Sequence, residues 1–200
     1  DIDLTKYKNQ EHIGSMFKDY NLDQVNKIQV VKQADVVMLL YLLEHKFSKE
    51  VKKANYDYYE KRTLHDSSLS LSTHSILASD IDEKDLAYKL FQEATKIDLG
   101  ENMKTSDHGI HAASLGGLWQ IVVNGFGGLR MVGGNLRINP KLPENWSRLS
   151  FSFMWKGNKL DIELTKEGIK IEVKDEMLEE IEILVYDTKY VLNQILKIKF

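Results

Sequence analysis

The spacing of the apolar residues changes near Arg130, and this change constrains the fold more than any other feature of the sequence. Before Arg130 apolar residues recur at helical intervals, and in residues 34–45 they occupy every side of the predicted helix. After Arg130 they alternate with polar residues, as in residues 149–155. The pattern predicts an α+β chain, with helices over most of residues 33–124 and an antiparallel sheet from residue 149 onward.

The predicted helices alternate between fully apolar and half-polar ones, as expected when an inner layer of helices is sheathed by an outer one. Helices are expected at residues 34–45, 68–79, 82–97 and 112–124. A further helix is expected to begin after Ser48, which can serve as its N-cap. Strands are expected at residues 149–155, 160–164, 169–173 and 181–185, entered through the irregular segment 139–146. We therefore divide the chain into a helical part, residues 1–130, and a β part, residues 131–200.

Composition and charge exclude several classes of function. The 200 residues are 42% hydrophobic, which is enough for one substantial core. With 27 basic and 30 acidic residues the net charge is −3, so we expect no nucleic acid or membrane partner. The chain has no cysteine and no apolar run of the roughly 18 residues that a spanning helix needs, which favours a cytoplasmic protein. It does not start with Met, so we expect a piece of something longer.

Polar and glycine-rich motifs stand at the ends of the predicted helices. Together they supply hydroxyls, imidazoles and an ammonium group, which suit a phosphate or sugar site. The motifs are Lys32-Gln33-Ala34-Asp35, Arg62-Thr63-Leu64-His65-Asp66-Ser67-Ser68-Leu69-Ser70, Gly109-Ile110-His111-Ala112-Ala113-Ser114 and Gly125-Phe126-Gly127-Gly128-Leu129-Arg130. Judged by residue type alone, each of these residues also fits a structural role without a ligand. Ser67 and Ser68 are typical helix caps, His111 is typical of a core histidine, and Lys32 is typical of a surface lysine.

These four motifs, in this order, resemble the C-terminal third of the family 65 glycoside phosphorylases, which act on maltose, kojibiose, nigerose or trehalose. The resemblance continues through residues 140–146 into the predicted strands, so it covers nearly the whole chain. It implies that residues 1–130 are the last helices of an (α/α)6 barrel catalytic domain. Residues 131–200 would then form a small antiparallel C-terminal β-sheet domain.

The resemblance also implies a reaction: inverting phosphorolysis of an α-linked glucose disaccharide to β-glucose 1-phosphate and a free sugar. Inorganic phosphate is then the co-substrate, and no cofactor or metal is expected. By the same resemblance, Ser67, Ser68 and His111 bind phosphate, whereas Lys32 and Gln33 bind the transferred glucose. An inverting hydrolase needs two carboxylates, but phosphate is itself a nucleophilic anion and needs a cradle of donors instead.

The family's general-acid glutamate belongs to a motif upstream of the Lys32-Gln33 pair. We therefore expect no catalytic residue within this chain, and we expect the chain alone to be inactive. The family also suggests a homodimer for the complete protein.

Three other interpretations stay open. A hydrolase of the same family, similar to an acid trehalase, would use water in place of phosphate. A noncatalytic carbohydrate-binding module would use Trp146 and Trp155 to stack on sugars. A metal site drawing on Asp107, His108 and His111, with the His65-Asp66 pair, is the weakest, because the spacing matches no known ligand motif.

Overall fold

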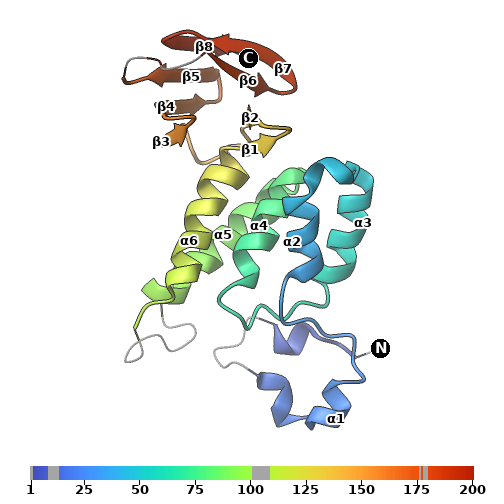
Figure 1. The fold of residues 1–200 in the computed structure, drawn as a ribbon. Helices are drawn as coiled ribbons and strands as arrows, with labels where there is room; N and C mark the ends of the chain where they lie inside the picture. Colours follow the sequence, from blue (N-terminus) through green and yellow to red (C-terminus); the bar gives the residue numbers. More distant parts are fainter. Residues whose placement is uncertain (1, 9–13, 101–108, 176, 178–179) are drawn as a thin grey trace. The chain divides into compact units, whose positions relative to one another are not determined.

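The computed structural model describes residues 2–8, 14–100, 109–175, 177 and 180–200. It consists of two compact units, Asp1–Ile121 and Val122–Phe200. The first is helical and the second is built of strands, so the predicted α+β class is confirmed (Figure 1).

The helices of the first unit run alternately up and down. In Figure 1, α2, α4 and α6 begin at the same end of the group of helices α2 to α6, while α3 and α5 run back toward that end. The helices are α1 Leu22–Val25, α2 Asp35–Leu42, α3 Lys49–Glu60, α4 Ser70–Asp80, α5 Lys84–Leu99 and α6 Ala112–Gln120. Short 3-10 turns occur at Thr5–Tyr7, Ser15–Lys18 and Glu44–Lys46, and a π-helical turn over Ile121–Phe126 follows α6.

Burial differs between the two helices with the most uniform apolar patterns. Helix α4 packs against α2, α3, α5 and α6, and every residue from Ser70 to Ser79 except Ser72 is buried. Helix α2 buries Val37 and Leu40 but exposes Met38, Leu39 and Leu42, although its sequence predicts burial on all sides. The helices of this unit cover one side of α2, and its opposite side is a bare apolar surface.

The segment before α2 packs against the turn that precedes α4. Tyr7 and Met16 form a small buried cluster with Leu64. A parallel bridge joins Val31 to Thr63, so the chain entering α2 lies beside the chain entering α4. These contacts hold the two predicted ligand-binding segments at one end of the unit.

The described residues of the second unit form two four-stranded sheets rather than one, in the orders β1-β2-β6-β7 and β3-β4-β5-β8. All strand pairs are antiparallel except β2 with β6, which is parallel. The predicted strands are present as β3 Arg148–Trp155, β4 Asn158–Thr165, β5 Gly168–Val173 and β6 Ile181–Val185. No bounds were predicted for four further strands, β1 Leu129–Val132, β2 Asn135–Ile138, β7 Thr188–Leu192 and β8 Ile195–Lys199.

One apolar core holds this β unit together. Alternate residues of β4, Leu160, Ile162 and Leu164, are at most 1% exposed within it. Trp146 and Trp155 pack against the same core and are partly buried, which favours a structural role over an open sugar-stacking surface. The part of the chain that the structure describes contains no helix long and apolar enough to cross a membrane.

Candidate functional site

The predicted site residues stand immediately before α2, α4 and α6, whose first turns lie at one end of the group of helices α2 to α6, next to the N-terminal segment that carries α1 (Figure 1). None of these helices has a side-chain hydrogen bond at its N-cap. The first N–H of α6, that of Ala112, donates to the carbonyl of Ile110 at 3.1 Å, whereas α2 and α4 have no side-chain acceptor at their N-caps. The helix dipoles direct positive potential toward this end. By contrast α3, which begins at the opposite end, is capped by Ser48, whose Oγ accepts from the N–H of Val51 at 3.4 Å.

Lys32 and Gln33 lie exposed in the bend that leads into α2. The residue before them, Val31, donates its N–H to the carbonyl of Arg62 at 2.9 Å. Gln33 also lines a cavity of about 150 Å³ together with Thr63 and His74. The Lys32-Gln33 pair is thus placed against the chain that leads to Ser67 and Ser68.

Ser67 and Ser68 lie in the turn before α4, which begins at Ser70 rather than at the predicted Ser68. Ser67 is buried and Ser68 is half-buried. The Oγ of Ser67 accepts from the N–H of Leu69 at 3.4 Å, and its carbonyl accepts from the Ser70 hydroxyl at 3.3 Å. Because a serine hydroxyl is donor and acceptor at once, the Ser67 hydroxyl proton stays available to an anion.

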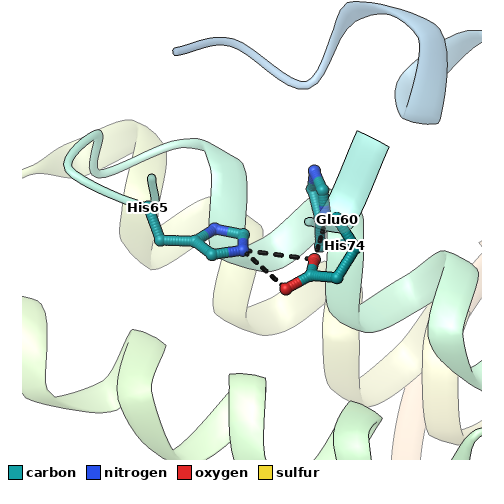
Figure 2. Close-up of side chains that lie close together, drawn as sticks. All are labelled: Glu60, His65 and His74. Atoms are coloured by element: carbon teal, nitrogen blue, oxygen red, sulfur yellow. Dashed lines mark hydrogen bonds and ion pairs between the residues drawn. The ribbon is translucent and has the colours of Figure 1, made fainter. Parts of the chain in front are cut away.

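A buried network centred on Glu60 supports this turn. Figure 2 shows the Glu60 carboxylate between the rings of His65 and His74. The His65 Nε2 lies 3.2 Å from both carboxylate oxygens, and the His74 Nδ1 lies 2.5 Å from Oε2. The other nitrogen of His65, Nδ1, lies 3.1 Å from the Ser70 hydroxyl, which itself bonds Ser67. A chain of hydrogen bonds therefore runs from the end of α3 to the Ser67 backbone.

The backbone at His65 fixes this arrangement. His65 has a φ of +57°, in the left-handed region that non-glycine residues rarely adopt. Its side chain is 2% exposed and that of His74 is 0% exposed, so both rings are enclosed by the protein. The hydrogen bonds of the enclosed ring therefore offset the strained conformation of the turn.

Burial and hydrogen bonding act in opposite directions on Glu60. Burial alone raises the pKa of the Glu60 carboxyl, but the hydrogen bonds from His65 and His74 outweigh it and hold the pKa well below its usual range. Burial also lowers the pKa of His74, more than the bond to Glu60 raises it. At neutral pH the network consists of an ionised Glu60 and a neutral His74 that donates from Nδ1.

The ligand atoms of Glu60, His65 and His74 lie within 4.8 Å of one another, as in a metal site. However, both imidazoles bond the carboxylate directly, and the Lys8 ammonium lies 3.5 Å from its Oε1. A cation is therefore already paired with this carboxylate, and the geometry is that of a hydrogen-bonded network.

The weaker metal interpretation drew on other residues. Asp107 and His108 lie outside the described residues. The carboxylate of Asp66 accepts from the N–H of Gly14 at 3.2 Å. His111 bonds Asp98 and is not part of the cluster around Glu60, so the described residues do not bring the proposed ligands together.

His111 precedes α6 and is bonded to Asp98, near the end of α5. Its Nδ1 lies 3.0 Å from Asp98 Oδ1, and its backbone N–H donates to the same oxygen at 3.2 Å. Helices α4 and α6 also touch, since a Cβ added at Gly117 would lie 2.7 Å from the Ser72 Oγ. No contact between described residues joins Ser68 directly to His111; they share the end of the unit at which α4 and α6 begin.

The sequence analysis missed Glu60 and Asp98. Each lies in the last turn of a helix, where a carboxylate is an ordinary solvated residue by pattern alone. Their partners lie on other elements, so helical spacing gives no signal for either. Asp98 is 13 positions from His111 and Glu60 is 14 from His74.

The chain thus combines a helical unit, in which the predicted site residues precede three helices, with a β unit of two sheets. The chain belongs to glycosyl hydrolase family 65. Residues 1–120 match the central catalytic domain of that family, and residues 129–192 match its C-terminal domain.

Curated relatives and a solved structure agree with this family. The chain is 45% identical to the kojibiose phosphorylase of Halothermothrix orenii, over 96% of the chain and 25% of that relative. It is 44% identical to the α,α-trehalose phosphorylase of Thermoanaerobacter brockii, over 85% of the chain and 22% of that relative. A solved structure of a human-microbiome protein, provisionally named a kojibiose phosphorylase, is 35% identical with a TM-score of 0.89, covering 100% of this chain and 29% of that one.

The chain thus spans about a quarter of the length of these relatives. The predicted resemblance to the disaccharide phosphorylases of this family is confirmed. Enzymes of this kind use inorganic phosphate as the co-substrate and need no cofactor.

Proposed function

We propose that the complete enzyme, a protein of the relatives' length that carries this chain, cleaves an α-linked glucose disaccharide with phosphate and inverts the anomeric configuration. The products are β-glucose 1-phosphate and a free sugar. Phosphorolysis is the activity in the names of the kojibiose and trehalose phosphorylases that the chain matches.

The observation that carries this proposal is the shared end of α2, α4 and α6 (Figure 1). Ser67 and Ser68 precede one of these helices and His111 precedes another. Hydroxyl groups, an imidazole and helix N-termini without side-chain caps are the donors that a phosphate dianion prefers. In our proposal Ser67, Ser68 and His111 bind the phosphate.

Lys32 and Gln33 bind the transferred glucose in this proposal. Both are exposed at the start of α2, beside the chain that leads to the serine pair. An amide can donate to one sugar hydroxyl and accept from another, and the ammonium also offsets phosphate charge. Phosphate held behind the anomeric carbon attacks it while a glutamic acid, outside this chain, protonates the leaving oxygen.

Ser68→Ala in the complete enzyme tests the phosphate assignment, with Ser150→Ala, an exposed serine of β3, as the control. The rate of glucose 1-phosphate formation is measured as phosphate is titrated at saturating disaccharide. Losing one hydrogen bond to a charged group weakens binding by roughly ten- to a hundredfold, so we expect the KM for phosphate to rise while disaccharide binding changes less. Unchanged phosphate dependence in both Ser68→Ala and His111→Ala would remove these residues from the site and favour the hydrolase alternative.

The cytoplasmic location, the homodimer, the (α/α)6 barrel and the inactivity of the isolated chain stay predictions. Activity of the purified 200-residue chain on any disaccharide would contradict the last of them.

A further inference from the structure

Among the described residues, the carboxylate of Asp98 makes two hydrogen bonds, both with His111. Its Oδ1 accepts from both the ring Nδ1 and the backbone N–H of His111. The Asp98 side chain is 10% exposed and that of His111 is 34% exposed. Oδ2 is buried and has no hydrogen-bond partner among the described residues. A nearly buried carboxylate is thus directed at one histidine, whose ring is still open to a ligand.

We propose that Asp98 is a positioning residue for phosphate: it holds Nδ1 of His111 toward α5 and thereby leaves Nε2 as the nitrogen that faces the anion. This inference rests on the phosphate site proposed above, because it assigns to Asp98 the orientation of a residue in that site.

The chemistry of imidazole explains why such a partner matters. The two ring nitrogens are distinct, and the hydrogen bond at one determines what the other can do. With Nδ1–H bonded to a carboxylate, the ring cannot turn that nitrogen to the ligand. While Nδ1–H stays bonded to Asp98, donation from Nε2 to phosphate requires protons on both nitrogens, and the anionic carboxylate stabilises that charged ring.

The ionisation of Asp98 agrees with this role. The hydrogen bond from the His111 side chain, aided by the one from its backbone, lowers the pKa of the Asp98 carboxyl below its usual value despite burial. Asp98 is therefore ionised at neutral pH, when the enzyme meets phosphate.

A purely structural role is the alternative. His111 is the N-cap of α6, and its backbone N–H donates to the Asp98 carboxylate, which links α5 to α6. Asp98→Asn separates the two roles. Asparagine keeps an oxygen that can accept from both groups of His111, so the link between the helices remains, but the negative charge is lost. The matched control is Asp85→Asn, an exposed aspartate in the first turn of α5.

The test measures kcat and the KM for phosphate in the complete enzyme at saturating disaccharide. The variants are Asp98→Asn, His111→Ala, the double variant and Asp85→Asn. We expect Asp98→Asn to raise the KM for phosphate about tenfold, with a smaller change in kcat, and Asp85→Asn to change neither. In the His111→Ala background we expect Asp98→Asn to add less than about twofold, because residues that act through one another are not additive.

Two results would overturn this inference and leave the phosphate site intact: a raised KM in His111→Ala with none in Asp98→Asn, or the same increment from Asp98→Asn in both backgrounds. An unchanged KM in His111→Ala would overturn the phosphate assignment of His111 and this inference together. Thermal unfolding of each variant shows whether it folds. If Asp98→Asn does not, Asp98→Glu, which displaces the carboxylate by one methylene, is compared in the same two backgrounds with the same criteria.

Discussion

Replacing Glu60 with glutamine isolates the contribution of the buried network, because the two side chains have nearly the same shape. The carboxylate accepts from His65 and from His74, and a glutamine amide cannot do so with both of its ends. Its NH₂ group would face a ring nitrogen that donates. In either orientation of the amide, Glu60→Gln therefore removes the negative charge and sets an amide N–H against at least one donating ring nitrogen.

The magnitude follows from the number of bonds and their burial. Each hydrogen bond to a charged group contributes about 1.5 to 3 kcal/mol, and breaking a buried charged pair costs about 3 to 5 kcal/mol. The Glu60 side chain is 18% exposed, so solvent screens it little. We expect Glu60→Gln to lower the free energy of unfolding by about 3 kcal/mol, which lowers the Tm of an enzyme of the relatives' length by roughly 2 °C.

The assay is thermal unfolding of the complete enzyme, with Asp57→Asn as the matched control. Asp57 lies on the exposed side of the same helix, α3, and pairs with Lys53 at 2.6 Å. A surface pair of this kind contributes about 0 to 1 kcal/mol, so its loss lowers the Tm by less than about 1 °C. Equal Tm values for Glu60→Gln and Asp57→Asn would refute the idea that the network stabilises this end of the unit.

Three further predictions come from the described residues. Acid should destabilise the enzyme from about pH 6.5 downward, because His74 takes up a proton in the unfolded chain, whereas burial lowers its pKa in the folded enzyme. The lowered pKa of Glu60 adds a second loss of stability below about pH 4.5. Measuring the Tm as a function of pH checks both effects. Gly128→Ala should lower the Tm by several degrees, because Gly128 has a φ of +65° and an added Cβ would lie 1.9 Å from the Asn139 carbonyl oxygen; an unchanged Tm would show that β1 can shift. The isolated chain should self-associate through the exposed apolar side of α2, around Leu42. A monomeric mass measured by light scattering at micromolar concentration would contradict this.

Periodicity in the sequence was sufficient for the elements that carry strong patterns. Helices α4 and α5 and strands β3 to β6 lie close to their predicted ranges. The bounds of the short hairpin β1–β2 were not predicted, although Gly133 and Gly134, both with positive φ, form its turn. Four-residue strands give too few alternations to delimit. The parallel pairing of β2 with β6 is set by packing between distant segments, which no local pattern encodes.

The candidate site divides in the same way. Ser67, Ser68 and His111 stand in motifs, so the sequence identified them. Glu60 and Asp98 depend on which helix ends meet in three dimensions, and their partners come from α4 and from the start of α6. Helix α2 shows the opposite situation. Its apolar sequence predicts burial on every side, but the helices of this unit leave one apolar side of it exposed.

The central claim is that phosphate, not water, is the nucleophile. Its most direct test gives the complete enzyme kojibiose, trehalose, nigerose or maltose and measures glucose 1-phosphate and glucose as phosphate is varied. We predict that at least one disaccharide yields glucose 1-phosphate in proportion to its consumption, with a rate that rises with phosphate and falls to background without it. Release of glucose at the same rate with and without phosphate, with no glucose 1-phosphate, would contradict the claim and identify a hydrolase.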